Sequence, residues 1–218
     1  MLSYEQILDA LANCCFDDLN GYNYYDNIIA LMDNTIINPH YYEYGATKLV
    51  LLPPHQDFVI KIPFCGYDDE FWDSQYYPFE NAEEPDGWNY CEVEKLKYAK
   101  AKEAGIEFLF AETKLIGYVK DHPIYVQPKM KIFSEAKNYS DYSVIKNKRT
   151  KDKCHKSNIN CFHVHWISDF LDYFDIETLQ KLDEWLENNN INDLHGGNLG
   201  YHPLTGQPII IDYSDFND

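Results

Sequence analysis

Basic residues are scarce in this chain. Lysine and arginine together number 18 against 36 aspartates and glutamates, which gives a formal net charge of −18, and Arg149 is the single arginine. Proteins that bind nucleic acid neutralise the backbone phosphates with lysine and arginine side chains. The composition therefore argues against nucleic acid as a partner.

Long apolar runs are also lacking. The chain has no stretch of about 18 apolar residues, which a membrane-spanning helix needs, and its first residues lack the basic and apolar regions of a signal peptide. The 6 cysteines of this 218-residue chain, with Cys14 and Cys15 adjacent, do not form a disulfide framework. We therefore expect a cytoplasmic protein with reduced thiols, no membrane partner and a single domain over residues 1–218.

The most informative motif lies in the last quarter of the chain. Residues 193–198 read Asp-Leu-His-Gly-Gly-Asn, and an apolar run after a Pro-Leu-Thr-Gly turn ends in Asp212. Phosphoryl transfer depends mainly on positioning the nucleophile and neutralising phosphate charge, and oxygen ligands suit Mg²⁺. In this chemistry Asp193 would accept the proton of the attacking hydroxyl, while Asn198 and Asp212 would hold the metal. The same residue types also make an ordinary solvated loop, so the upstream segments decide between the two interpretations.

Upstream, the pattern predicts strands with one embedded lysine. Residues 44–52 read as two strands joined by a turn at Gly45, and residues 57–63, Asp-Phe-Val-Ile-Lys-Ile-Pro, read as a third strand that contains Lys61. A lysine among valine and isoleucine is costly to bury unless it is paired.

A partner for this lysine is expected on the next helix. Residues 89–104 have a helical pattern that includes Glu92 and Glu94. The two carboxylates point to different sides of a helix, and we favour Glu94 as the partner of Lys61.

In this order, the motifs resemble those of the protein-kinase-like superfamily over roughly residues 40–218. The 193–198 motif is more similar to the aminoglycoside-phosphotransferase-like and other atypical kinases, because His195 stands where serine/threonine kinases carry a lysine. The chain also resembles short kinase-like proteins encoded by bacteriophages. The resemblance implies an α+β, two-lobe fold, with an N-terminal lobe over residues 1–130 and a reduced C-terminal lobe over residues 131–218.

The same resemblance implies a site for ATP and Mg²⁺. Lys61 would contact the phosphates, and Gln127 to Met130 falls where kinases bind adenine through backbone groups. The residues expected around the nucleotide are Gly45, Lys61, Glu94 or Glu92, Pro128 and Met130. Ile191 replaces the usual histidine two residues before Asp193, and we expect it to order the loop by packing. Because the chain stops at Asp218, no activation segment is expected.

An acidic, aromatic insertion is predicted over residues 63–90, since no basic residue occurs between Lys61 and Lys95. We favour a solvated loop, as is usual for charge runs. The alternative is a docking surface for a basic host protein, because aromatic residues anchor interfaces. A second copy of the chain is another expected partner, since the short ending leaves the nucleotide site open on one side.

Helical spacing predicts two leading helices over residues 3–14 and 22–33, and two more over residues 164–174 and 177–188. Further strands are expected over residues 108–119 and 123–127. A polar loop is expected over residues 134–160.

A zinc site is a further possibility. Cysteine and histidine residues, the usual zinc ligands, cluster near the end of this polar loop: Cys154, His155, Cys161, His163 and His165. Their spacing matches no standard zinc finger, so we favour a buried cysteine with surface histidines.

Two functions remain. The first is an ATP- and Mg²⁺-dependent phosphotransferase acting on a hydroxyl acceptor, on a protein or elsewhere. The second is an inactive kinase-like binding protein, such as a phage effector or inhibitor of a host protein in the host cytoplasm. The missing helices that bind peptide substrates favour the second. We favour the first, because a scaffold has no physical need for Lys61, Asp193, Asn198 and Asp212 together.

Overall fold

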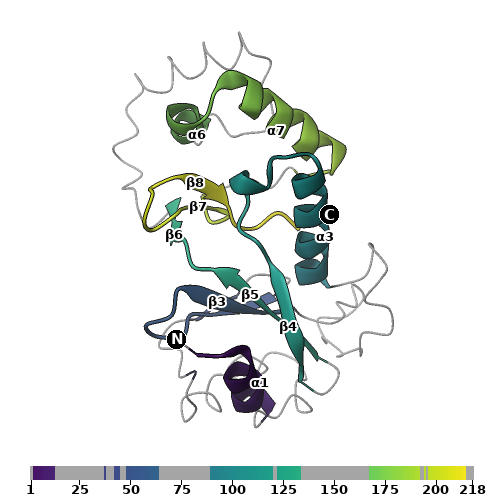
Figure 1. Ribbon diagram of the computed structural model, residues 1–218, viewed down its shortest axis with the longest axis vertical. Helices are drawn as coiled ribbons and strands as arrows, with labels where there is room; N and C mark the ends of the chain where they lie inside the picture. The colour runs from purple at the N-terminus through teal and green to yellow at the C-terminus, as the bar shows by residue number, and fades with distance from the viewer. Residues whose placement is uncertain are drawn as a thin grey trace, which may run out of the picture. The chain divides into compact units, whose positions relative to one another are not determined.

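The computed structural model describes residues 2–12, 37, 42–44, 48–63, 89–119, 122–133, 167–191, 194 and 196–214. Within these residues the chain is a mixed α+β protein with four α-helices and two antiparallel sheets (Figure 1). It divides into two compact units, Met1–Lys95 with Thr113–Lys129 (unit 1) and Leu96–Glu112 with Met130–Asp218 (unit 2). From the sequence we placed one division near residue 130, whereas the structure also assigns Leu96–Glu112 to unit 2.

Unit 1 contains a five-stranded antiparallel sheet in the order β1-β2-β3-β5-β4. Its strands are β1 (Tyr42–Tyr44), β2 (Lys48–Leu51), β3 (Phe58–Pro63), β4 (Lys114–Val119) and β5 (His122–Pro128). All residues of β3 are buried, because β3 lies in the middle of the sheet with β2 on one side and β5 on the other. The predicted strand around Lys61 is therefore confirmed.

Helix α1 (Tyr4–Ala12) covers part of this sheet and confirms the first predicted helix. It begins with a reciprocal cap, in which the N–H of Gln6 donates to Ser3 Oγ and the N–H of Ser3 donates to Gln6 Oε1. Ile7 and Leu11 are fully buried in one core with apolar residues of β2, β3 and β5. The second leading helix, predicted over residues 22–33, lies outside the described residues, as does most of the predicted insertion over residues 63–90.

Helix α3 (Tyr90–Glu103) follows, and it ends where Gly105 adopts a φ of 68°. The N–H of Ile106 donates to the carbonyl of Ala101, and the N–H of Gly105 donates to that of Lys102. This is the glycine cap that closes many helices, since glycine enters the left-handed region without a Cβ penalty.

The strand predicted over residues 108–119 is wrong in its first part. A 3₁₀ helix, η3 (Glu107–Leu109), follows the glycine cap, and β4 begins only at Lys114. Between them, the N–H of Ala111 donates to the carbonyl of Ile210 at 2.9 Å, far along the chain. Phe110 and Ala111 take part in this long-range pairing and do not belong to β4.

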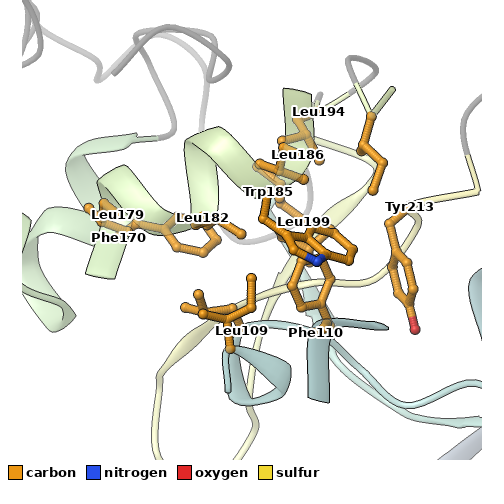
Figure 2. Close-up of a cluster of buried hydrophobic side chains, with 14 of the residues drawn as sticks. Leu109, Phe110, Phe170, Leu179, Leu182, Trp185, Leu186, Leu194, Leu199 and Tyr213 are labelled. Carbon is orange, nitrogen blue, oxygen red and sulfur yellow. The ribbon is translucent and has the colours of Figure 1, made fainter. Parts of the chain in front are cut away.

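Unit 2 contains helices and a small antiparallel sheet in the order β6-β7-β8. Its elements are α6 (Ile167–Tyr173), α7 (Ile176–Asn188), β6 (Lys131–Ile132), β7 (Leu199–Tyr201) and β8 (Pro208–Ile210). The helices predicted over residues 164–174 and 177–188 are therefore both present. Phe110 packs in the core cluster of unit 2, with its ring centroid 5.0 Å from that of Trp185 and 5.1 Å from that of Tyr213 (Figure 2).

None of the helices that the structure describes combines the length and the apolar composition that a membrane span requires.

Candidate functional site

Lys61 is buried in the centre of the unit 1 sheet. Only 3% of its surface is exposed, and in the β-ladder it lies opposite Val50 of β2 and Tyr125 of β5. Its Nζ lies 2.8 Å from Glu94 Oε2 and 3.1 Å from Glu94 Oε1. The predicted ion pair between Lys61 and Glu94 is therefore present.

The carboxylate of Glu94 is saturated with donors. Besides the two contacts from Lys61, its Oε1 lies 2.6 Å from Lys48 Nζ and its Oε2 accepts a hydrogen bond from Thr113 Oγ1 at 2.5 Å. Glu94 is 0% exposed. A carboxylate offers about four lone-pair sites, and all of them are used here, as a buried charge requires.

Lys48 is a member of this cluster that our sequence analysis missed. It is 4% exposed and lies on β2, where it is opposite Pro63 of β3. Residues two apart on a strand share a face, so Lys48 lies on the same face as Val50, the residue opposite Lys61. A lysine that directly precedes Leu-Val-Leu in a strand is the same signal that identified Lys61.

The first turn of α3 explains why Glu94, and not Glu92, faces the lysines. Asn89 caps the helix through its Oδ1, which accepts from the N–H of Glu92, while its Nδ2 donates to the hydroxyl of Tyr125 at 2.8 Å. The same hydroxyl donates to Glu92 Oε2 at 2.8 Å. These bonds tie Glu92 to β5, and Glu94, about 200° further round the helix, then points to Lys61.

A chain of buried hydrogen bonds continues from Glu94 to the end of β5. Gln127 Nε2 donates to Thr113 Oγ1 at 2.9 Å, and Thr113 donates onward to Glu94. Both side chains are buried. The sequence did not predict this link to Glu94 for either residue, because it depends on how β4 and β5 pair and not on the local sequence pattern.

The segment predicted to bind adenine follows Gln127. Pro128 ends β5 and is exposed, and it offers a carbonyl but no N–H. The N–H of Lys129 donates to the carbonyl of Asp57 at 2.8 Å. Met130 is half-buried and directly precedes β6. Contact with adenine remains a prediction for Pro128 and Met130.

In unit 2, the hairpin of β7 and β8 brings Asn198 and Asp212 together. Leu199 pairs with Ile210, so the two predicted metal ligands extend from the same end of the hairpin. The carbonyl oxygen of Asn198 accepts from the N–H of Ile211 at 2.8 Å and from that of Asp212 at 3.3 Å. Ser214 Oγ donates to Asp212 Oδ1 at 3.1 Å, which orients that carboxylate.

The loop that contains Asp193 is anchored on both sides by the core of unit 2. Helix α7 ends at Asn188, and Asn190, with a φ of 52°, turns the chain so that the N–H of Ile191 donates to the carbonyl of Leu186. Ile191 and Leu194 are both buried in the core cluster (Figure 2 labels Leu194). Ile191 thus packs as expected from the sequence, while Asp193 and His195 themselves lie outside the described residues.

Other predicted residues also lie outside the described part of the chain. They are Gly45 and the candidate zinc ligands Cys154, His155, Cys161, His163 and His165. Among the residues that the structure does describe, no three histidine, cysteine, aspartate or glutamate side chains gather as a metal site would require.

Comparison of the chain with protein-family models, with curated proteins and with solved structures found no match.

Proposed function

We propose that this protein is an ATP- and Mg²⁺-dependent phosphotransferase that transfers a phosphoryl group to a hydroxyl acceptor. The observation that supports this most is the buried ion pair between Lys61 of β3 and Glu94 of α3. Protein kinases hold a lysine of the third strand with a glutamate of the following helix, so that the ammonium contacts the nucleotide phosphates. In this proposal the chain has a kinase-like, two-lobe fold with a reduced second lobe.

The cost of burying these charges argues for a functional role. Apolar residues of similar size often stabilise a core as well as, or better than, a buried ion pair. Lys61 stands in a fully buried strand, with the apolar residues Ile60 and Ile62 on either side in the chain. A lysine kept at this position is therefore better explained by a ligand than by stability.

The donor set of unit 2 is suited to Mg²⁺. Asn198 and Asp212 supply amide and carboxylate oxygens from one hairpin end, and Mg²⁺ takes oxygen ligands. When bound, Mg²⁺ would neutralise the charge of the phosphate oxygens. Asp193 would accept the proton of the acceptor hydroxyl, held in place by its buried neighbours Ile191 and Leu194.

We also propose a cytoplasmic location. The buried Cys91 of α3 is a free thiol, which is typical of a reducing compartment.

The test is a calorimetric titration of the wild-type protein with ATP, with and without Mg²⁺, alongside the variant Lys61→Met. Wild type should bind ATP, and Mg²⁺ should tighten the binding. Lys61→Met should weaken it about tenfold or more, since charge-assisted contacts to phosphate are among the strongest hydrogen bonds. If the folded wild-type protein binds no nucleotide at millimolar ATP, the phosphotransferase proposal is wrong and the binding-protein alternative replaces it.

A further inference from the structure

Two buried lysines share one carboxylate in unit 1. Lys48 of β2 and Lys61 of β3 lie on the same face of the sheet, and both ammonium groups contact Glu94. Lys48 makes the shorter contact to Oε1, at 2.6 Å against 3.1 Å for Lys61. Lys61 contacts both oxygens of the carboxylate.

This arrangement matters because an ammonium group has only three N–H donors. Lys61 directs N–H groups at both oxygens of Glu94, which leaves at most one N–H for a phosphate, so a second phosphate contact requires it to give up part of that interaction. Glu94 is fully buried, and a buried carboxylate that loses its cation is strongly destabilised. A second cation that stays on Glu94 removes this conflict.

We propose that Lys48 is this second cation: a positioning residue that keeps Glu94 neutralised so that Lys61 can turn toward the nucleotide phosphates. The inference rests on the proposed function. Lys48 makes no contact with the nucleotide in this inference. The effect of replacing Lys48 on nucleotide affinity should therefore depend entirely on the carboxylate of Glu94.

The chain offers a matched pair of variants. Lys48→Met leaves Lys61 and Glu94 as a one-to-one pair, and Lys61→Met leaves Lys48 and Glu94 as a one-to-one pair. Both remove one buried ammonium group and put an unbranched apolar side chain in its place. Lys48→Arg, which keeps the charge, should restore most of the affinity.

The decisive experiment is a double-mutant cycle on MgATP affinity with Lys48→Met and Glu94→Gln. In the wild-type background, Lys48→Met should weaken binding about tenfold, because Glu94 then holds Lys61 alone. In the Glu94→Gln background the neutral amide no longer competes for Lys61, and Lys48→Met should change the affinity less than about twofold. Circular dichroism and urea unfolding establish that each variant is folded. If Lys48→Met does not fold, Lys48→Gln gives the same comparison with a donor to Glu94 retained.

Three results would overturn the inference. An unchanged affinity in folded Lys48→Met would make Lys48 merely structural. Equal losses in both backgrounds would mean that Lys48 contacts the nucleotide itself. Absence of MgATP binding by wild type would instead refute the proposed function, and this inference with it.

Discussion

The backbone N–H of Asp212 donates to the backbone carbonyl oxygen of Asn198 at 3.3 Å. The side chains of these two predicted metal ligands therefore extend from neighbouring backbone positions of one hairpin. The contact is made by backbone atoms, which means that the side chains can be replaced without removing it. The hairpin thus allows the metal hypothesis to be tested apart from the fold.

Asp212→Ala should remove most of the enhancement of ATP affinity by Mg²⁺ while leaving unfolding by urea nearly unchanged. Ser214→Ala should have a smaller effect in the same direction, because it removes the hydrogen bond that orients Asp212 Oδ1 but leaves the carboxylate in place. Loss of such an outer partner typically weakens metal binding about 10-fold to 100-fold. ATP titrations at several Mg²⁺ concentrations measure both effects.

An exposed carboxylate of unit 2, Glu184, is the control for this series. Glu184→Ala should behave as wild type. A full Mg²⁺ enhancement in Asp212→Ala would show that the metal, if bound, is held elsewhere.

The central part of the fold could be predicted because it has strong local signals. Strand β3 is a short apolar run around Lys61, and helix α7 has a clear hydrophobic period and is capped by Asp175, whose carboxylate accepts from the N–H of Thr178. The choice between Glu92 and Glu94 needed the structure, since it depends on how α3 is rotated. That rotation comes with hydrogen bonds to Tyr125, a residue of a distant strand.

Features that depend on strand register could not be predicted in the same way. Lys48 and Thr113 reach Glu94 only because β2 and β4 take particular positions in the sheet. The wrong start of the strand predicted over residues 108–119 has a similar cause, since Ala111 pairs with Ile210. Hydrophobic pattern alone contains no information on these long-range pairings.

The cluster around Glu94 should contribute strongly to stability. Glu94→Ala leaves the ammonium groups of Lys48 and Lys61 without this carboxylate, and breaking a buried pair by removing one partner costs about 3–5 kcal/mol. Thr113→Val should cost less, about 1.5–3 kcal/mol, because it removes the hydroxyl that donates to Glu94 and accepts from Gln127 but leaves both lysines on the carboxylate. Urea unfolding gives both free energies.

Lys95→Ala is the control for this second prediction. It breaks the ion pair of Lys95 with Glu92 on the same helix, but the lysine side chain is 39% exposed, so the cost should stay below about 1 kcal/mol. Equal losses in Glu94→Ala and Lys95→Ala would contradict the view that burial makes the Glu94 cluster costly to break.

Tyr125 should make stability depend on pH in the alkaline range. Burial raises the pKa of its hydroxyl well above the ordinary value of 10.0, and the hydrogen bond to Glu92 adds to the rise. A folded pKa above the unfolded one gives stability that is complete below about pH 10 and is lost as the pH rises further. Tyr125→Phe should therefore cost about 1–3 kcal/mol near pH 8, and its difference from wild type should shrink above about pH 10.

Unfolding free energies in urea, measured near pH 8 and again above about pH 10, test this effect. Tyr118→Phe is the matched control, since Tyr118 is 55% exposed on β4, and it should keep the pH dependence of the wild-type protein. A constant difference between wild type and Tyr125→Phe across the alkaline range would show that ionisation of Tyr125 does not limit stability.

The catalytic role of Asp193 predicts a separation of binding from turnover. Asp193→Ala should leave MgATP affinity nearly unchanged, because the proposed base contacts the acceptor hydroxyl and not the nucleotide. The fold should persist, since the neighbours Ile191 and Leu194 that anchor the loop in the core are retained. Turnover of ATP should fall on the order of 10²-fold to 10⁴-fold, the usual contribution of a general base.

Asp172→Ala, which removes an exposed carboxylate of α6, is the control and should keep both the MgATP affinity and the turnover of the wild-type protein. Turnover at the wild-type rate in Asp193→Ala would exclude Asp193 as the base, even if Lys61 and Asp212 prove necessary for binding.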